Sequence, residues 1–600
     1  MDAWKRIKTS GSFKRSVKKN FNKINNVNPQ LYKKNIPLKS FTDSSSQKTT
    51  PEFSVDEITP ECSSSSRIKP SSDCTDTSTN YTISNEEDFA EPELEDETFA
   101  NMRLLTDLQS WAVKYNIRQT ALKELLTILN TRLSDILPRD PRTLLKTVQT
   151  VKLVQMDNGQ YWHQGIETCI DRMLPEITEP LTISVKVNID GLPVYKSSKD
   201  EFWPILINID EFPQVEPMIV GIYAGKQKPA CVVNFLTPFV DDMEIVCKDG
   251  IIVNGHKVSV AIKGFVCDSP ARAFIKGTAY FNAQNGCQKC TTTGEYSYVS
   301  HTNYFPRARC PPRTDWDFRN KKYGSHHKND SPLLRLNIDM IKDFAVGDSL
   351  HLIDLGIMKK LLLGWRDGKF GSYNTKWPAN VTVNLSKRLL QLRMPHEIHR
   401  ALRGVDCIGH WKGLEFRTFL NYVSIVVLKP ILSSEVYEHF LSFFCAITIC
   451  SSESYTHLLD LADMLLMHFH DHFKDIYGED YVSSNVHNLT HLIDDVKRFG
   501  ILSRFSAYPF ENKLFQIKNL IRSGRNPLSQ IAKRLSLCKN FVNQWFLTKS
   551  HEVVAMNFVV KNRNEETKIK VTSDSFYGTK LQVFANYFSQ AAPEKFWSAY

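Results

Sequence analysis

Residues 182–190 read TISVKVNID, a short stretch in which β-branched apolar residues alternate with polar ones before an aspartate. Two similar runs follow, FWPILINID at 202–210 and PMIVGIYAG at 217–225, with the turn sequences GLP and EFPQ between the three. Short runs rich in β-branched residues and bounded by turn signals are typical of strands. The sequence therefore predicts three consecutive strands that form a meander in one sheet.

A fourth strand is predicted after a helix over 231–244. The dipeptide NG at 254–255 is a hairpin signal, and it leads into KVSVAIKGFVCD at 257–268. Pro270 follows, and a helix is expected from Ala271 to about Phe281. The order strand, strand, strand, helix, strand, helix indicates an α/β fold with a mixed sheet. It resembles the order of a ribonuclease H-like core, in which acids at the ends of the first and fourth strands become neighbours.

Composition bounds the class of protein. A chain of 600 residues with 42% hydrophobic residues supports roughly three to four domains. The thirteen cysteines are odd in number and scattered, and no apolar segment follows the basic N-terminus, so a secreted disulfide framework is not expected. The longest apolar stretches, 419–428 and 440–450, are shorter than the about 20 residues that cross a bilayer. No membrane span is predicted.

The first 98 residues are predicted to be a disordered tail. Residues 1–39 hold eleven Lys or Arg against the single acid Asp2, and 40–98 are rich in Ser, Thr, Asp and Glu without apolar periodicity. The basic segment 1–39 is typical of segments that bind phosphate backbones or serve as a nuclear import signal. The alternative is a tail that is merely solvated. The next region, 99–175, is predicted to be helical. Its first two helices meet near residues 115–118, in a helix-turn-helix for DNA or in an ordinary packing hairpin.

Five blocks of sequence carry a resemblance to a known family. Together they resemble the transposases of the CACTA (En/Spm) group and their animal relatives, in the same order, over about residues 99–540. The blocks are NIDGLPVYKSSKDEFWPI (188–205), CDSPARAFIKGTAYFNAQNGCQKC (267–290), GDSLHLIDLGIMKKLLLGW (347–365), NVHNLTHLIDDV (485–496) and YPFENKLFQIKNLIRSGRNPLSQIAKRL (508–535).

The resemblance implies a ribonuclease H-like DDE catalytic domain whose second and third acids are separated by a long, mostly helical insertion. Carried over position by position, the acids are Asp190, Asp268 and Glu511. Three carboxylates are enough to hold two Mg²⁺ or Mn²⁺ ions, with Asp190 bridging them, for in-line chemistry at a phosphodiester. The alternative is that each acid is an ordinary surface residue.

A zinc site is also predicted, in the segment 286–330. Cys287 and Cys290 form a CxxC, which zinc commonly completes with two more Cys or His. The resemblance implies that histidines complete the set. The expected ligands are Cys287, Cys290, His301 and His327, with His326 or Cys310 as substitutes. A buried, reduced cysteine pair without metal remains the alternative.

Other residues in the matching blocks are weaker candidates. His351 matches one block, and His487 and His491 match another at a spacing that shares a helix face and permits metal binding. For these histidines a packing or phosphate-contacting role is favoured. Three basic residues after Glu511 suit DNA phosphates or a solvated helix face equally well: Arg522, Arg525 and Lys533.

The separations between the acids define the remaining domains. Asp268 and Glu511 are 243 residues apart, too far for a loop in a compact domain. The expected organisation is a first part of the core at 180–285, a helical insertion at 331–500, a catalytic helix closing the core at 501–540 and a β-rich module at 541–600.

These inferences predict a nuclear DDE transposase that cleaves and transfers DNA strands at transposon ends. Its partners would be double-stranded DNA and further copies of itself on that DNA. One alternative is a domesticated or inactive transposase-derived protein that binds DNA or other proteins. Another is an unrelated zinc-dependent scaffold without catalysis.

Overall fold

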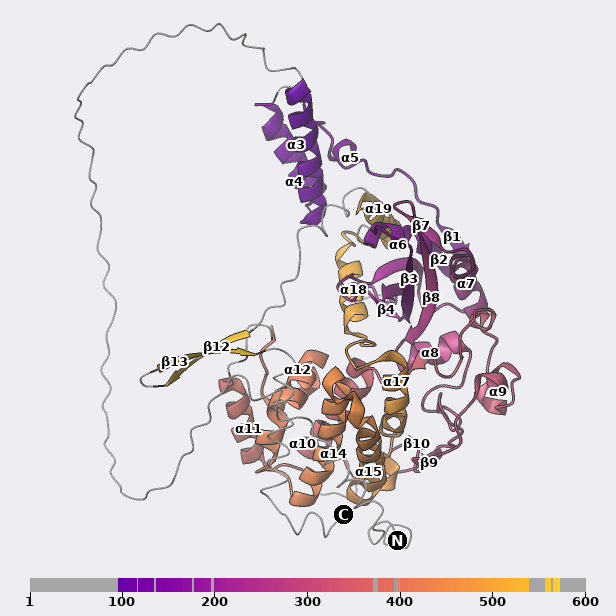
Figure 1. Cartoon of the computed structure of the whole chain (residues 1–600), viewed down its shortest axis with the longest axis vertical. Helices are drawn as coiled ribbons and strands as arrows, with labels where there is room; N and C mark the ends of the chain where they lie inside the picture. The colour runs from indigo at the N-terminus through magenta and orange to yellow at the C-terminus, as the bar shows by residue number, and fades with distance from the viewer. Residues whose placement is uncertain are drawn as a thin grey trace, which may run out of the picture. The chain divides into compact units, whose positions relative to one another are not determined.

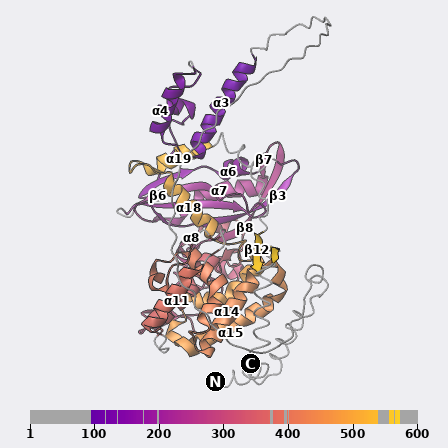
Figure 2. The same ribbon diagram turned by 90° about the vertical axis from the view of Figure 1, so that its left-hand side faces the viewer.

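A nine-stranded mixed sheet forms the centre of the fold in the computed structural model (Figures 1 and 2). Seven strands follow the order β1-β2-β6-β5-β3-β8-β11, while β4 pairs with β5 and β7 with β8. The strands are β1 Val154–Met156, β2 Gly159–His163, β3 Leu181–Ile189, β4 Leu192–Pro193, β5 Glu201–Ile209, β6 Met218–Gly225, β7 Ile251–Val253, β8 His256–Val266 and β11 Phe344–Ala345.

The structure describes residues 95–571 except 116, 134–135, 175–176, 196–198, 371–375, 393, 395–397, 399, 539–555 and 563–564. The predicted tail at 1–98 therefore lies outside the described residues as far as position 94. The chain divides into two units, 21–104 and the remainder. The sheet, the helical region and the candidate sites all belong to the second unit.

Strand directions change at β3, which lies between β5 and β8 in the sheet. β3 pairs antiparallel with β5, which pairs antiparallel with β6, as the predicted meander requires. On its other side β3 runs parallel to β8, and β8 runs parallel to β11. Parallel neighbours need a crossover connection, and helix α7 (Val232–Asp249) provides it between β6 and β8.

Helices cover both faces of the sheet, which explains why β3 and β5 are buried along most of their length. On one face α7 buries Phe235 and Phe239 against the odd-numbered residues of β3 and β5, in a core that also takes in α6 (Ile166–Met173) and α8 (Ser269–Lys276). On the other face, the Lys186 ammonium of β3 donates to the Arg504 carbonyl oxygen just before helix α18 (Tyr508–Asn519).

A mostly helical region lies between β8 and α18 in sequence. Its π-helix η4 (Ser349–Met358) continues directly into α10, and the long helices α14 and α15 pack side by side, with ring centroids of Phe443 and Phe469 at 5.3 Å. The helices of this region are α9 Asp315–Arg319, α10 Lys359–Asp367, α11 Ala379–Gln391, α12 Gly413–Thr418, α13 Ser424–Leu428, α14 Ser434–Cys450, α15 Leu459–Tyr477, α16 Ser484–Asn488 and α17 Leu492–Phe499.

Smaller elements complete the described chain. A hairpin of β9 and β10 precedes α9, and another of β12 and β13 lies in the segment where a β-rich module is expected. The remaining bounds are α3 Glu95–Lys114, α4 Gln119–Asn130, α5 Pro141–Leu144, β9 Glu295–Ser297, β10 Thr302–Tyr304, α19 Pro527–Cys538, β12 Met556–Asn562 and β13 Glu565–Val571.

The four long strands and the helix between them agree with the sequence analysis, and two local expectations differ. Region 99–175 is not wholly helical, because the hairpin β1–β2 extends the sheet beyond β6. Its tight turn places Asp157 at φ 49°, before Asn158 and Gly159, a hairpin signal that the helical expectation overlooked. The insertion expected to be helical over 331–500 also contains the two-residue strand β11, which precedes the π-helix that begins at Ser349.

A bulge sets the register between β3 and β8. Before it Val185 lies opposite Ile262, and after it Lys186 lies opposite Gly264, so that β8 has one residue more than β3. Gly264 has φ 153°, and a Cβ there would come within 2.5 Å of the Asp343 carbonyl oxygen. Only glycine fits this position without moving β11, which follows Asp343.

Replacement of Gly264 by alanine is therefore expected to lower the free energy of unfolding by about 2–4 kcal/mol, from backbone strain together with overpacking. Chemical denaturation monitored by far-ultraviolet circular dichroism measures the change. Gly409→Ala is the matched control, because a Cβ at Gly409 meets nothing within 4 Å. If Gly264→Ala and Gly409→Ala were equally stable, the requirement for glycine at this bulge would be contradicted.

Candidate functional site

Two aspartates meet at the ends of the parallel strands β3 and β8. The last printed pair of the two strands is Val187 with Phe265, and Asp190 and Asp268 each follow their member of this pair by three residues, just beyond the strand ends. Hydrogen bonding extends the pairing, because the Asn188 side-chain amide donates to the carbonyl oxygen of Val266 at 2.8 Å. Neighbouring strands lie about 4.8 Å apart, so the two carboxylates share one small region.

Backbone groups orient each aspartate. The Asp268 carboxylate caps helix α8 and accepts from the Ala271 backbone N–H at 2.7 Å. The Asp190 carboxylate accepts from the Gly191 N–H at 2.6 Å. Each of these contacts uses one oxygen, which leaves the second oxygen of each carboxylate for another partner.

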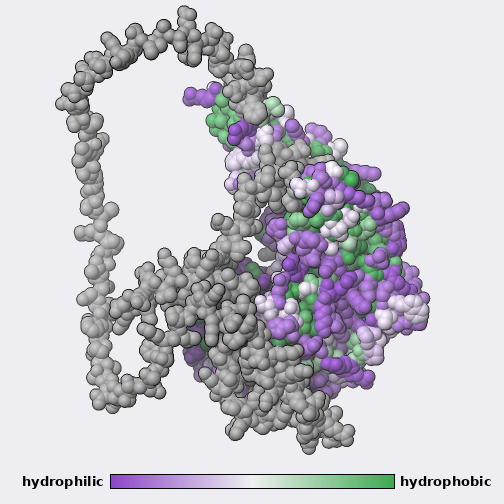
Figure 3. Space-filling view, viewed as in Figure 1, coloured by the Kyte–Doolittle hydropathy of each residue, from purple (hydrophilic) through white to green (hydrophobic). Residues whose placement is uncertain are grey.

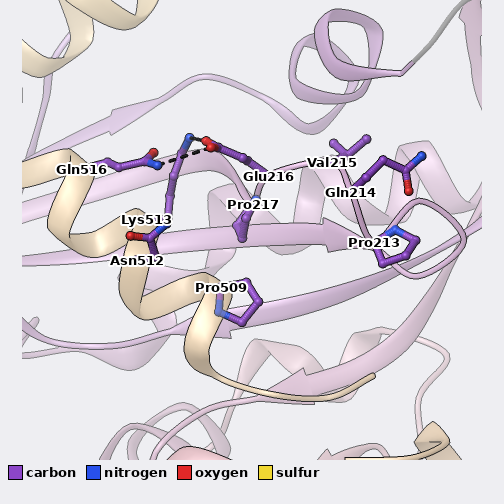
Figure 4. A pocket seen from close by; sticks show the side chains of 9 residues that line it. All are labelled: Pro213, Gln214, Val215, Glu216, Pro217, Pro509, Asn512, Lys513 and Gln516. Atoms are coloured by element: carbon purple, nitrogen blue, oxygen red, sulfur yellow. Dashed lines mark hydrogen bonds and ion pairs between the residues drawn. The ribbon is translucent and has the colours of Figure 1, made fainter. Parts of the chain in front are cut away.

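Glu511 reaches the same region from the first turn of α18. The start of this helix is fixed to the π-helix η4, because the Tyr508 hydroxyl donates to the Asp354 carboxylate at 2.7 Å and the Ser506 and Ser349 hydroxyls lie 2.9 Å apart. Farther along α18, Lys513 lies 3.1 Å from the Glu216 carboxylate in the loop before β6 (Figure 4). The helix that carries Glu511 is therefore held at both the insertion and the sheet.

A histidine of η4 completes the cluster. The His351 Nε2 atom lies 3.7 Å from Glu511 Oε1, and its Nδ1 atom lies 3.3 Å from Asp348 Oδ2. Asp190, His351 and Glu511 each offer one ligand atom, and these atoms all lie within 4.8 Å of one another, a geometry that could hold a metal ion. Asp268 is not in that group of three. Its negative charge, from just beyond the neighbouring strand, raises the pKa of Asp190.

The acids of this cluster repel one another in the absence of a cation. Burial, with the charges of Asp268 and Glu511, raises the pKa of Asp190 to about 8. Burial also raises the pKa of Asp268, against the effect of its bond to Ala271. Burial alone would lower the pKa of His351, but Asp348, Glu511 and Asp190 outweigh it and raise that pKa well above the usual value.

The second cluster joins the CxxC to His487 of α16 and to His491, which precedes α17. Its four atoms are close together: Cys287 Sγ to Cys290 Sγ 3.6 Å, Cys287 Sγ to His491 Nε2 3.4 Å, Cys290 Sγ to His487 Nε2 3.3 Å, and the two Nε2 atoms 3.2 Å apart. Zinc bond lengths of about 2.3 Å to sulfur and 2.0–2.1 Å to nitrogen imply tetrahedral edges of roughly 3.3–3.8 Å. This buried Cys₂His₂ cluster is compatible with a structural zinc site.

The Cys287 thiol has the chemistry of a metal ligand, while the contact with Cys287 and burial raise the pKa of Cys290. Although burial by itself raises a thiol pKa, the contact with Cys290 and the imidazoles of His491 and His487 hold the pKa of Cys287 well below its usual value. A thiolate is the form that binds zinc.

The histidines that lie beside Cys287 and Cys290 are not the predicted ones. His301 is exposed in a turn at φ 53°, and His327 stacks on Tyr323 with ring centroids 6.1 Å apart. His326 is buried, but its Nδ1 contacts the Asn285 carbonyl oxygen at 2.7 Å. The completing pair, His487 and His491, was favoured for packing. Its four-residue spacing on one helix face was the signal in the sequence.

Other candidates are not members of these clusters. Arg522 donates to the Ile117 carbonyl oxygen in the turn between α3 and α4, and Arg525 is exposed. Cys310 is half-buried and outside the group of four. Asp348 was not among the predicted residues, although it stands three residues before His351 in the block GDSLHL.

Comparisons of this chain with protein-family models and with curated proteins found no match. Among the helices in the described ranges, none combines the length and the apolar character needed to cross a membrane. Hydrophilic side chains cover much of the coloured surface in Figure 3, with apolar ones between them.

The raised pKa of Asp190 predicts how the stability of the metal-free protein depends on pH. Between the usual value of 3.8 and about 8 the folded state holds a proton that the unfolded state has lost, so stability falls as pH rises through this window. Asp190→Asn should flatten this dependence and stabilise the metal-free fold at pH 8 by about 2 kcal/mol or more, since one pKa unit corresponds to about 1.4 kcal/mol. Thermal unfolding at several pH values measures both effects. If Asp190→Asn left the pH dependence of stability unchanged, the clustering of Asp190 with Asp268 and Glu511 would be contradicted.

The Cys₂His₂ cluster predicts the zinc content of the purified protein. One zinc ion per chain is expected by elemental analysis, and Cys287→Ser or His487→Ala should abolish it and lower the unfolding temperature, because metal binding adds to folding free energy. His301→Ala and His327→Ala are the matched controls and should keep the ion. If Cys287→Ser and His487→Ala kept zinc while His301→Ala or His327→Ala lost it, the assignment of the ligands would be contradicted.

Proposed function

We propose that the chain is a DDE-type transposase that cleaves and joins DNA strands in a metal-dependent reaction. The observation that carries the proposal is the convergence of Asp190, Asp268 and Glu511, which lie 78 and 243 residues apart in sequence. These are the three acids that the resemblance to the CACTA transposases implies.

The topology supports a ribonuclease H-like core. In chain order the strands β3, β5, β6, β8 and β11 serve as strands one to five, arranged 3-2-1-4-5 across the sheet. The first three are antiparallel, and the fourth and fifth run parallel to the first. The acids stand after strands one and four and on a helix that follows the insertion, as the DDE arrangement requires.

The donor set suits two divalent cations. Carboxylate oxygens are the ligands that Mg²⁺ and Mn²⁺ accept, and burial of like charges raises the pKa of Asp190 in the absence of a cation. When bound, such ions would activate the attacking water or 3′-hydroxyl and stabilise the leaving oxygen. Asp190 would contact both, because it lies beside Asp268 on one side and Glu511 on the other.

The protein's own residues supply orientation and access. Bonds from Ala271 and Gly191 fix the two aspartates, and the Tyr508–Asp354 pair fixes the start of α18. The Glu511 side chain is 41% exposed, so the cluster opens to solvent on the side where a DNA strand would approach. The proposed partners are double-stranded DNA and further copies of the chain, and the proposed compartment is the nucleus.

A strand-cleavage assay tests the proposal. The substrate is DNA that carries the inverted repeats flanking the coding locus, incubated with the full-length protein and Mn²⁺. The wild type should cut at the repeat ends, and Glu511→Gln should cut about a hundredfold more slowly or less, because a group that stabilises the transition state is lost.

Glu435→Gln on α14 is the matched control, since Glu435 is an exposed glutamate in the insertion. It should cut at the wild-type rate. Equal rates for wild type and Glu511→Gln would remove Glu511 from the mechanism. DNA binding without cleavage by the wild type would instead favour the domesticated, inactive form of the protein.

A further inference from the structure

The π-helix η4 places a histidine among the catalytic acids. π-Helical segments are rare and occur frequently at functional sites. Here the segment carries His351 with its Nε2 atom 3.7 Å from Glu511 Oε1, in a group with Asp190 whose ligand atoms all lie within 4.8 Å. The imidazole is only 25% exposed, so its position is set by packing.

A buried carboxylate stands behind this histidine. Asp348 accepts at one oxygen from the backbone N–H groups of Leu350 and His351, both at 3.0 Å, and its other oxygen lies 3.3 Å from His351 Nδ1. This contact is an ion pair without hydrogen-bond geometry, and it lies where metal-binding histidines in proteins usually have a carboxylate, on the ring nitrogen that does not bind the metal. The arrangement directs Nε2 toward Asp190 and Glu511.

The two sides of Asp190 therefore differ in their chemistry. On the side of Asp268 the donors among the described residues are the carboxylates of Asp190 and Asp268, and Asp268 already uses one oxygen to cap α8. On the side of Glu511 an imidazole nitrogen joins the carboxylates. Mg²⁺ strongly prefers oxygen ligands, whereas imidazole nitrogen suits transition metals.

We propose that His351 is a metal ligand, and that the cation between Asp190 and Glu511 is held by a mixed nitrogen and oxygen set that takes Mn²⁺ in preference to Mg²⁺. The cation between Asp190 and Asp268 has oxygen ligands from the protein. The inference rests on the proposed function, which supplies the carboxylate centre, and it adds a ligand and a metal preference.

Pulsed electron paramagnetic resonance of Mn²⁺ tests the inference on the full-length, zinc-loaded protein. The wild type should show coupling of bound Mn²⁺ to a directly bonded nitrogen, and ¹⁵N labelling of histidine should change that signal. Calorimetric titrations with Mn²⁺ and with Mg²⁺ should show Mn²⁺ bound at least about tenfold more tightly at this position.

Two variants examine the ligand and its support. His351→Leu should lose the nitrogen coupling and most of the preference for Mn²⁺, while Asp190 and Glu511 still bind the ion. Asp348→Asn should keep the coupling but weaken Mn²⁺ binding by about 10–100-fold, the usual effect of removing an orienting partner. His410→Leu, at an exposed position, is the matched control and should change nothing.

The outcomes separate this inference from the proposed function. Tight Mn²⁺ binding in the wild type without any nitrogen coupling would overturn the role of His351 and leave the carboxylate centre in place. Mn²⁺ binding that is unaffected by Asp190→Asn and by Glu511→Gln would overturn the carboxylate centre itself. The isotope comparison uses the wild-type protein, so it remains decisive even if a variant folds poorly.

Discussion

The arrangement of the candidate site depends on the parallel pairing of β3 with β8. One extra residue in β8 shifts the register so that Asp190 faces Asp268. If Lys263 paired regularly instead of being bulged, Asp190 would stand level with Cys267, and Asp268 would lie one position farther along, on the opposite face of the sheet. Gly264 permits the shift, because its backbone conformation and its closeness to the Asp343 carbonyl oxygen exclude a side chain. A backbone irregularity in the middle of the sheet therefore sets the chemistry at its end.

The insertion contributes more than length between the second and third acids. Its π-helix supplies Asp348 and His351, and through the Tyr508–Asp354 hydrogen bond it fixes the start of the helix that carries Glu511. Burial raises the pKa of Asp354 to about 8, although the bond from Tyr508 opposes the shift. A buried polar pair of this kind is favourable only when both partners are satisfied, so it specifies one position for α18.

The Cys₂His₂ cluster brings the CxxC segment that precedes the helical insertion next to the last part of that insertion. The pair Cys290 and His487 is separated by 197 residues, and closing so long a chain segment carries a conformational cost that a metal cross-link would reduce. Asp495, on the following helix, extends this link. Its carboxylate lies 2.7 Å from the Lys289 ammonium and accepts from the backbone N–H groups of Val346 and Gly347, directly before Asp348. The cluster and the candidate active centre thus share one set of buried contacts.

Much of this protein can be read from local sequence. Alternation of apolar and polar residues determines the strands of the meander and β8, helical periodicity determines most of the insertion, and the CxxC identifies half of the metal cluster. These patterns are visible because each depends on neighbours within a few residues. The resemblance to a transposase family pointed to Asp190, Asp268 and Glu511 one at a time.

Only the tertiary structure decided which residues meet. It selected His487 and His491 over His301 and His327, placed His351 beside Glu511, and set the bulge that brings the aspartates into line. The reason is physical: these contacts join positions up to about two hundred residues apart, and local sequence periodicity carries no information about which distant elements pack against one another.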